Sequence, residues 1–375
     1  MATLSLNGLR VLDLSRVLAG PLCTMMLGDL GADVIKVERP GRGDDTRGWG
    51  PPFDPRGESA YYLSINRNKL SVAADLRREK DRALIRSLAL EADVVVDNFL
   101  PGTLDRLGLD PDDLLQRNEE LIWCTITGFG SASRRLGYDY VVQAESGWMA
   151  ITGDPMGDPM KTGVALADIL AGKDAAIAIL AALHTRRGAP LKDRYLLISL
   201  AHSARAALTN VAQNALVSGR DATRWGNAHA NLVPYQLFHA TDRPLVIAVG
   251  TDEQWVALTR VLELPKLGED AALATNAGRL AQRERVVAAV ADVVRKRMAD
   301  EWRRLLDAAQ VPCGMVKTVT EAIADAGSAS ALTGMPSSVG GRARFAPPRL
   351  DEHGQQIRET KWGVFDRYRG TGPSS

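Results

Sequence analysis

The arrangement most suited to chemistry in this sequence is a carboxylate at the start of a helix. A short apolar segment, 163–167, ends at Asp168, and an Ala-, Ile- and Leu-rich helical run follows at 174–183. In that position Asp168 faces unpaired backbone N–H groups and the positive end of the helix dipole, so we expect it to stay ionised. An ionised, positioned carboxylate can attack an activated acyl group as a nucleophile. The alternative is a helix N-cap, the commoner role of an aspartate in such a window.

The N-terminal segment predicts a site for a phosphate-bearing ligand. A strand at 10–14 leads through the turn 15–21 into a helix at 21–30, and a second strand follows at 33–38. This order resembles a dinucleotide-binding unit, but the turn holds one glycine where the Gly-x-Gly-x-x-Gly fingerprint needs three. A nicotinamide dehydrogenase is therefore disfavoured, whereas the helix N-terminus can still receive a phosphate- or adenine-bearing ligand.

The sequence lacks the residues that several other reaction types require. The sequence has no Gly-x-Ser-x-Gly elbow and no convincing Ser/His/Asp order for a hydrolase. Its five histidines show no ligand spacing, and its three cysteines are too few and too scattered for a disulfide framework or a Cys-x-x-Cys site. We therefore expect no metal.

The composition is that of a globular enzyme with a sizeable core. The chain has 375 residues, of which 45% are hydrophobic and 24% charged, so two domains are expected. A net charge of +1 without a basic run gives no electrostatic case for a nucleic-acid partner. Because we find neither a secretion signal nor 18 uninterrupted apolar residues, we expect a cytoplasmic protein without a membrane partner.

Alternating strand and helix patterns predict an α/β fold with a mostly parallel, Rossmann-like sheet. Predicted strands lie at 10–14, 33–38, 93–96, 121–126 and 195–200. Predicted helices lie at 21–30, 79–91 and 111–116. The run 195–200 is almost continuously apolar, which is typical of a strand buried on both faces.

The later sequence predicts a smaller α+β domain. A linker rich in Gly, Asn and His at 218–234 precedes a predicted strand at 244–249 and predicted helices at 252–262 and 279–309. The expected division is a large domain at 1–217, a linker and small domain at 218–325, and a C-terminal segment at 326–375.

Several short blocks occur in an order that points to one family. They lie at 8–15, 19–21, 30–38, 66–69, 92–99, 126–130, 226–227, 233–235 and 311–314, together with the segment around Asp168. On these blocks the sequence resembles the class III CoA-transferases from Leu6 to about Pro348. That family includes formyl-CoA and carnitine CoA-transferases and the α-methylacyl-CoA racemases.

The resemblance implies an assembly, substrates and a nucleophile. Family members form interlocked, ring-like homodimers, and their C-terminal segment returns to the large domain. The implied substrates are an acyl-CoA and a carboxylic acid, with coenzyme A as substrate and no permanently bound cofactor. The aspartate that matches Asp168 carries the acyl group as a mixed anhydride, and no general base is required because the reacting carboxylates are ionised. The matching CoA-binding positions are Val17, Leu18, Ala19, Arg39, Ala74, Arg77, Asn98, Phe99, Leu100 and Arg106.

The resemblance also separates activities within the family. Racemases move an α proton with a histidine in a Gly-His-Asp segment, where this chain has Tyr138. A tyrosine with an ordinary pKa near 10 cannot replace imidazole at neutral pH, which favours a transferase and leaves a racemase or isomerase as the alternative. A non-catalytic CoA- or nucleotide-binding protein is a third hypothesis.

Substrate contacts are less sharply indicated. Blocks at 49–52, 143–148, 159–163 and 231–235 look like the branch that uses succinyl-CoA with small dicarboxylic acids. Arg47 and Lys161 are candidate anchors for the second carboxylate, and Tyr138 is a further candidate substrate contact. The loop at Gly250 is a candidate oxyanion site, unless it is a plain strand-to-helix turn capped by Asp252. The segment 191–200 departs from the family pattern, which puts its turn and contacts in doubt.

Overall fold

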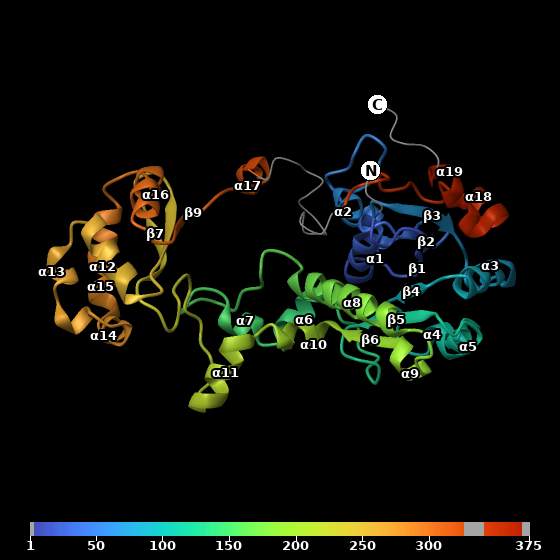
Figure 1. Ribbon diagram of the computed structural model, residues 1–375, viewed down its shortest axis with the longest axis horizontal. Coiled ribbons are helices and arrows are strands. Elements are labelled where there is room, and N and C mark those ends of the chain that lie inside the picture. The colour runs from blue at the N-terminus through green and yellow to red at the C-terminus, as the bar shows by residue number, and fades with distance from the viewer. Residues whose placement is uncertain (1–3, 326–340, 370–375) are drawn as a thin grey trace. The chain divides into compact units, whose positions relative to one another are not determined.

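The computed structural model describes residues 4–325 and 341–369 of a chain that divides into two compact units (Figure 1). The first unit contains the described residues up to Trp148, the segment Lys161–Ser218 and the described C-terminal residues. The second contains Met149–Met160 and the residues from Gly219 to Asp325. Of the predicted C-terminal segment, 326–340 and 370–375 lie outside the described residues. Each unit buries its own apolar clusters.

The described part of the first unit builds a six-stranded parallel sheet in the order β3-β2-β1-β4-β5-β6. The strands are β1 (Arg10–Asp13), β2 (Asp33–Glu38), β3 (Lys69–Ala73), β4 (Val94–Asp97), β5 (Ile122–Thr127) and β6 (Tyr195–Ser199). The predicted parallel α/β fold is confirmed. Only β3 was not predicted, because Lys69 and Ser71 interrupt its apolar pattern although every residue of the strand is buried.

The predicted burial of the strand at 195–200 on both faces is wrong. β6 lies at the edge of the sheet, where it pairs with β5, and the side chain of Leu197 is 51% exposed. Leu196 and Ile198 pack against the apolar cluster on one face of the sheet and Tyr195 against the cluster on the other, so the second face is only partly covered at Leu197.

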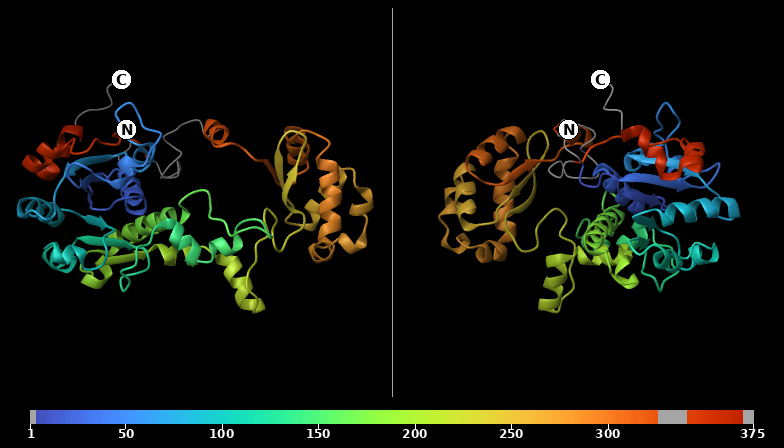
Figure 2. Two further views of the ribbon diagram at one scale, coloured as in Figure 1. Left: turned by 180° about the vertical axis from the view of Figure 1, so that it is seen from behind. Right: turned by 45° about the vertical axis from the view of Figure 1, so that its right-hand side comes forward.

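The opposite edge of the sheet is covered by the C-terminal segment. The N–H of His353 donates to the carbonyl of Ser71 (3.0 Å), and the N–H of Ala73 donates to Oδ1 of Asp351 (2.7 Å). Both views of Figure 2 show this red segment beside the blue strands of the same unit. These bonds satisfy backbone groups that β3 would otherwise expose, so β3 is buried despite its edge position.

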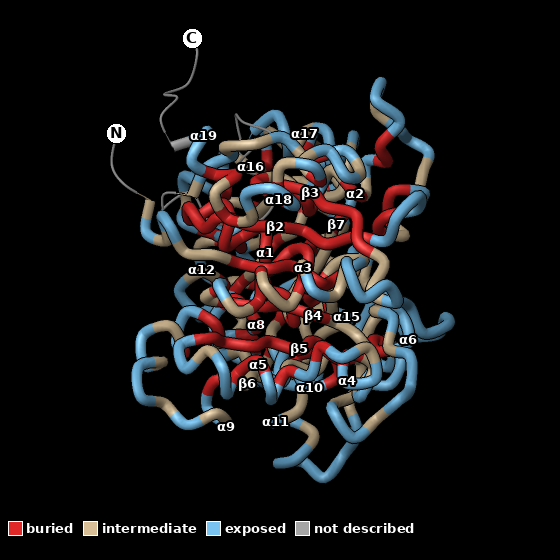
Figure 3. The backbone as a smooth tube through the Cα atoms, turned by 90° about the vertical axis from the view of Figure 1, so that its right-hand side faces the viewer, coloured by how far each residue is buried: buried red, intermediate tan, exposed pale blue. Residues whose placement is uncertain are grey.

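Side chains of each strand alternate between two buried layers, one on each face of the sheet. Val11 points into the layer shared with α1 (Ala19–Asp29) and α8 (Leu166–Thr185), whereas Leu12 points into the layer shared with α3 (Glu79–Leu90). In Figure 3 the strands β2, β4 and β5 appear as buried segments between these layers. The sheet therefore has helices on both faces, as a doubly wound fold requires.

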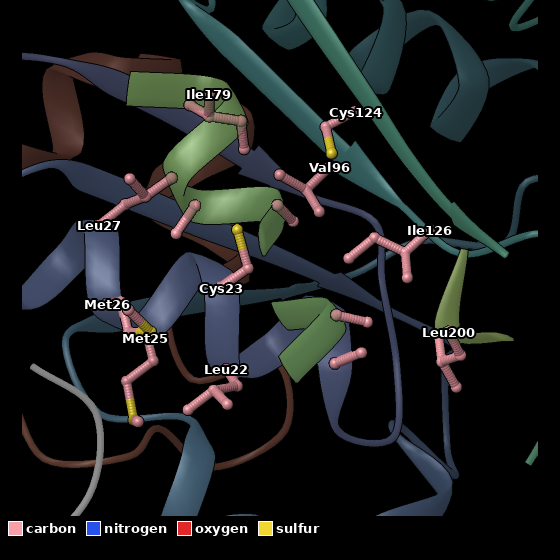
Figure 4. Close-up of a cluster of buried hydrophobic side chains, with 14 of the residues drawn as sticks. Leu22, Cys23, Met25, Met26, Leu27, Val96, Cys124, Ile126, Ile179 and Leu200 are labelled. Carbon is pink, nitrogen blue, oxygen red and sulfur yellow. The ribbon is translucent and has the colours of Figure 1, made fainter. Parts of the chain in front are cut away.

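Close packing of α8 against α1 sets the position of the helix that carries Asp168. A β-carbon at Gly172 would lie 2.6 Å from the carbonyl oxygen of Ala19, so glycine is required for this approach. Farther along the pair, Cys23 of α1 and Ile179 of α8 belong to one apolar cluster (Figure 4). Asp168 precedes Gly172 by about one helical turn and so lies on the same face of α8.

The predicted helices 21–30, 79–91 and 111–116 are confirmed as α1, α3 and α5, each within two residues at either end. No helix of the described residues is long and apolar enough to cross a membrane. The other described helices up to Ser218 and after residue 341 are η1 (Asp45–Gly48), α2 (Ala60–Ile65), α4 (Thr103–Arg106), α5 (Pro111–Arg117), α6 (Asp139–Glu145), α7 (Trp148–Ile151), α9 (Leu191–Arg194), α10 (Leu200–Ala206), α11 (Thr209–Ser218), α18 (Gly354–Thr360), η5 (Lys361–Phe365) and α19 (Asp366–Arg369).

The described part of the second unit has a three-stranded antiparallel sheet in the order β7-β8-β9. Its elements are β7 (Tyr235–His239), β8 (Pro244–Ala248), α12 (Asp252–Val261), α13 (Pro265–Gly268), η2 (Ala271–Leu273), α14 (Asn276–Ala281), α15 (Arg283–Val294), α16 (Ala299–Ala308), β9 (Cys313–Met315) and α17 (Val319–Asp325). The single helix predicted at 279–309 is wrong, because α14, α15 and α16 are separate. The N–H of Ala299 donates to Oδ1 of Asp242 (2.8 Å), and this bond caps the start of α16 as a separate helix.

Candidate active site

A cavity of about 150 Å³ opens at the carboxyl edge of the parallel sheet. Its wall includes Val17, Leu100 and Gly128, from the turns that follow β1, β4 and β5. The strands β1 and β4 are neighbours in the sheet but not in the sequence. Their connections leave in opposite directions, which opens a crevice at this point. Asp168, from the first turn of α8, lies in the same wall.

A second cavity of about 360 Å³ adjoins the first, because Arg16, Phe99 and Leu100 contribute to both walls. Arg39 and Ala74, which follow β2 and β3, line this second cavity. Together the two cavities follow the carboxyl edge of the sheet from β3 to β5, and the wall of the first holds Asp168.

The structure brings most of the predicted CoA contacts to these cavities. The first is lined by Val17, Leu18, Ala19, Asn98, Phe99, Leu100 and Tyr138 as well as Asp168. Arg39, Ala74, Phe99 and Leu100 line the second. Arg77 and Arg106 line neither cavity: the Arg77 side chain is 85% exposed and pairs with Asp75, and Arg106 donates to Oγ1 of Thr103 (3.2 Å).

Arg47 is enclosed in the protein instead of facing a substrate pocket. Its guanidinium makes two bonds of 2.8 Å with Glu38, pairs with Glu58 at 2.7 Å and donates to the carbonyl of Pro348 (3.2 Å). Burial opposes its charge, but Glu38 and Glu58 together raise the pKa of Arg47. The prediction that Arg47 anchors a substrate is corrected, because its donors bind this network.

Of the other three predicted substrate contacts, Tyr138 lines the first cavity, whereas Lys161 and Gly250 lie outside both cavities. Lys161 is exposed, and its Nζ donates to a neighbouring backbone carbonyl. Gly250 belongs to the second unit, and its N–H donates to Oε1 of Gln254 (2.8 Å). The N-cap of α12 is Thr251 and not Asp252, and Gln254 completes a capping box with it. The N–H of Gly250 is therefore occupied by a side chain of the same turn.

Asp168 is the third residue of α8, and Ala165 is the N-cap. The alternative prediction that Asp168 is only an N-cap is therefore wrong. Its side chain is half-buried, and burial together with the neighbouring Asp139 raises the pKa of Asp168 to about 7. The expectation that Asp168 is an ordinary ionised carboxylate is corrected, because burial and the charge of Asp139 both disfavour its ionised form.

Asp139, the first residue of α6, caps the helix that carries Asp168. Its Oδ1 accepts the backbone N–H of Ala167 (2.8 Å) and of Asp168 (3.3 Å). Its Oδ2 accepts Nε2 of Gln143 (2.6 Å), and Oε1 of Gln143 accepts the N–H of Thr162 (2.9 Å). These bonds connect α6, the segment before α8 and the first turn of α8, which fixes the backbone at Asp168.

The turn after β1 is held by buried charges. Val17 has a φ of 73°, a left-handed conformation that is costly for a β-branched residue. Its N–H donates to Oδ1 of Asp44 (3.2 Å), Asp44 pairs with Lys36 at 3.0 Å, and Nζ of Lys36 donates to the carbonyl of Ser15 (2.9 Å). The conformation of the cavity wall therefore depends on ion pairs beneath it.

Asn98 connects the two turns that form the crevice. Its Oδ1 accepts the N–H of Arg16 (3.1 Å), and its Nδ2 donates to the carbonyl of Arg16 (2.7 Å). Both polar atoms of the Asn98 side chain are thus used within the protein, which holds the β1 turn to the β4 turn.

Sequence reasoning missed Arg16, Arg135 and Leu136 of the first cavity. Arg135 pairs with Glu145, and its guanidinium lies 4.4 Å from the ring centroid of Phe129. The signal available for Arg135, Leu136 and Asp139 was their position in and beside the Gly137-Tyr138-Asp139 segment, from which only Tyr138 was interpreted.

Comparisons with known proteins identify the family of the chain. The sequence profile of CoA-transferase family III matches residues 6–357. The chain is 42% identical over 324 residues to the succinyl-CoA:glutarate CoA-transferase of Mus musculus, covering 86% of this chain and 74% of that protein. It is 43% identical over 329 residues to the succinate–glutarate CoA-transferase of Agrobacterium fabrum, covering 85% and 82%. A CAIB/BAIF family protein from Brucella suis has a TM-score of 0.84 at 39% identity, covering 96% and 99%.

The profile spans nearly the whole chain, and the relatives match across most of it. The chain belongs to CoA-transferase family III and is a transferase enzyme.

Proposed function

We propose that this enzyme moves CoA from succinyl-CoA to a small dicarboxylic acid through an acyl group carried on Asp168. The donor and the class of acceptor are those in the names of the mouse and Agrobacterium relatives. The observation that carries the proposal is the position of Asp168. It lies in the wall of a crevice at the carboxyl edge of the sheet, next to the turn at Val17–Ala19 and the loop at 98–101.

The proposed reaction proceeds by successive attacks on three carbonyl carbons, those of the donor, Asp168 and the acceptor. A carboxylate oxygen of Asp168 attacks the thioester carbonyl of the donor, the C–S bond breaks, and CoA leaves as a thiolate. The thiolate then attacks the Asp168 carbonyl of the mixed anhydride, which releases the donor acid and leaves an aspartyl-CoA thioester. The acceptor carboxylate attacks that thioester and expels the thiolate, forming a second anhydride. Attack of the thiolate on the acceptor carbonyl releases the new acyl-CoA and restores the Asp168 carboxylate.

The cavity walls suit a long neutral arm that ends at a reactive carbonyl. Leu18, Ile126 and Leu136 supply apolar surface beside Asp168. Such surface limits the access of water, which would otherwise hydrolyse the anhydride. The larger neighbouring cavity contains Arg39, which is suited to a phosphate group of CoA.

Because Arg47 is bound within the protein, the proposed anchor for the second carboxylate of the acceptor is a cation of the first cavity. Arg16 and Arg135 are the cations in the wall that contains Asp168. Arg135 pairs with the exposed Glu145, and such a pair is weak enough in water to exchange for a bound carboxylate.

We also propose that the enzyme acts as a homodimer, as the resemblance implies. Apolar side chains stand exposed on the edge strand β6 at Leu197 and on α11 at Leu216 and Val217. Exposed apolar groups at a sheet edge and on a helix are surfaces that a second chain can cover.

The test of the function is a substrate panel. The enzyme is incubated with succinyl-CoA and a series of mono- and dicarboxylic acids, and new thioesters are identified by mass spectrometry. We expect new thioesters from dicarboxylic acids in the native enzyme and none in Asp168→Asn. The control Asp174→Asn changes an exposed aspartate of the same helix that accepts a bond from Ser203 and lines neither cavity, so it should retain activity. Transfer at the native rate by Asp168→Asn would exclude the proposal.

A further inference from the structure

The first turn of α8 leaves no backbone donor for Asp168. The N–H groups at a helix start have no partner within the helix and commonly stabilise a nearby anion. Here the N–H of Leu166 donates to Val164 and that of Ile169 donates to Ala165. The N–H groups of Ala167 and Asp168 both donate to Asp139. A helix start that should favour the Asp168 carboxylate is thus occupied by another carboxylate.

Charged neighbours do not replace these donors. Among the described residues, no hydrogen bond or ion pair reaches the carboxylate of Asp168. The titratable and charged groups that face it from the surrounding elements are Asp139 at the start of α6, Tyr138 just before it, Tyr61 of α2, and the wall residues Arg16 and Arg135. The two arginines bind Asp45 and Glu145, and α10 places Ser203 against Asp174 of α8.

Asp139 is held in this position from its other side. Gln143, one turn later on α6, donates to its Oδ2 (2.6 Å) and also donates to the carbonyl of Val164 (3.4 Å). This contact occupies Oδ2 of Asp139 and leaves Oδ1 to accept the N–H groups of Ala167 and Asp168. The negative charge of Asp139 is therefore fixed close to that of Asp168.

We propose that Asp139 is a positioning residue: its fixed negative charge occupies the N-terminal donors of α8 and lies close to the Asp168 carboxylate, which therefore stays weakly stabilised and strongly nucleophilic. The inference rests on the proposed function, since it assigns a cause to the reactivity of the same side chain. A carboxylate that gains little from hydrogen bonds has more to gain on bonding to an acyl carbon. The raised pKa of Asp168 agrees with this geometry.

The decisive variant is Asp139→Asn, which keeps an oxygen for the two N–H groups but removes the charge. We expect the acid limb of the pH profile of kcat/KM to move down by roughly one pH unit, and the rate at pH 9 to fall by roughly 3- to 10-fold as the nucleophile becomes less basic. A purely structural cap would lower the rate at every pH and leave the limb in place, and that result would overturn the inference.

A second variant tests the inference if Asp139→Asn does not fold. In Asp139→Asn the new amide faces the amide of Gln143, so the double variant Asp139→Asn/Gln143→Glu restores a donor–acceptor pair and moves the charge away from Asp168. It should show the same downward shift, and an unshifted limb in this variant would equally refute the inference. The matched control is Asp110→Asn, which changes the N-cap of α5 away from both cavities and should leave the limb unmoved.

A binding-independent readout separates this inference from the proposed function. The titration of Asp168 is followed in the free protein by carbon-13 NMR of labelled aspartate, with Asp168→Asn to assign the signal. A lower titration midpoint in Asp139→Asn supports the inference even if the reaction proves to be a different one. An unchanged midpoint refutes it even if Asp168 is the nucleophile.

Discussion

Two carboxylates near the same turn, Asp13 and Asp168, have opposite electrostatic surroundings. Asp13 ends β1 and is fully buried, yet it pairs with Lys69 at 2.9 Å and accepts the hydroxyl of Thr24 (2.7 Å). Burial alone would raise the pKa of Asp13, but Lys69 and Lys36 outweigh it and hold that pKa below its ordinary value. Asp168 is less buried, has no cation partner among the described residues and has a raised pKa. Burial disfavours the charge of both carboxylates, and it is the cation partners of Asp13 that reverse the direction of the pKa shift there.

The largest expected effect is the loss of the buried charge at Asp13. Asp13→Asn leaves Lys36 and Lys69 without their shared counter-charge, so unfolding in urea should show a destabilisation of about 3–5 kcal/mol. Thr24→Val removes only a hydrogen bond to the same carboxylate and should cost about 1 kcal/mol. Equal costs for the two variants would remove the contrast between the paired and the unpaired carboxylate.

Removal of the charge at Asp168 should stabilise the protein, whereas its removal at Asp13 should destabilise it. Because its folded pKa lies above its unfolded value, the native state binds the proton more tightly, and Asp168 lowers the stability progressively as pH rises from about 4 to 7. Asp168→Asn lacks this penalty and should be more stable by about 1–4 kcal/mol at pH 8, with a smaller gain at pH 5. Thermal unfolding at both pH values measures the difference. A gain that is the same at both would show that the charge is not the cause.

The same pKa predicts the pH dependence of turnover. Only the deprotonated carboxylate is a nucleophile, so kcat/KM should rise with pH through about 7 and then level off. Between pH 6 and pH 8 the increase should be roughly tenfold. Initial rates in buffers of constant ionic strength test this, and a flat profile over that interval would mean that Asp168 is ionised throughout.

The smallest expected effect concerns the strained turn. Val17→Gly relieves a positive φ, which should offset the greater freedom of glycine in the unfolded chain and stabilise the protein by about 1 kcal/mol at most. The contrasting change Asp44→Asn weakens the ion pair that holds the turn and should raise KM for the acyl-CoA more than it lowers kcat. Unfolding curves and steady-state rates check the pair, and destabilisation by Val17→Gly would show that the turn is not strained.

The sheet and its helices were largely predictable because their apolar patterns are local. β3 was not, since its buried Lys69 finds its partners in Asp13 and Asn66, which no local pattern reveals. The edge position of β6 depends on the strand order, and the breaks between α14, α15 and α16 carry no proline at the points where the helices end.

The residues of the candidate site were likewise only partly predictable from the sequence. Asp168, Tyr138 and the turns at Val17–Ala19 and 98–100, all indicated by the resemblance, line one cavity. The two turns and Tyr138 follow β1, β4 and β5, which are neighbours in one sheet. The resemblance did not reveal that Arg47 binds Glu38 and reaches the C-terminal segment, because that contact joins distant parts of the chain. The capping of α8 by Asp139 was equally hidden, because the cap is supplied by a neighbouring helix.

Trapping of the acyl-enzyme shows directly whether Asp168 carries the acyl group. The enzyme is mixed with succinyl-CoA without an acceptor, treated with hydroxylamine or borohydride, digested and mapped by mass spectrometry. The account predicts modification of the peptide that contains Asp168, at that side chain alone, and no modification in Asp168→Asn. A modified residue elsewhere, or an unmodified enzyme that still transfers CoA, would contradict it.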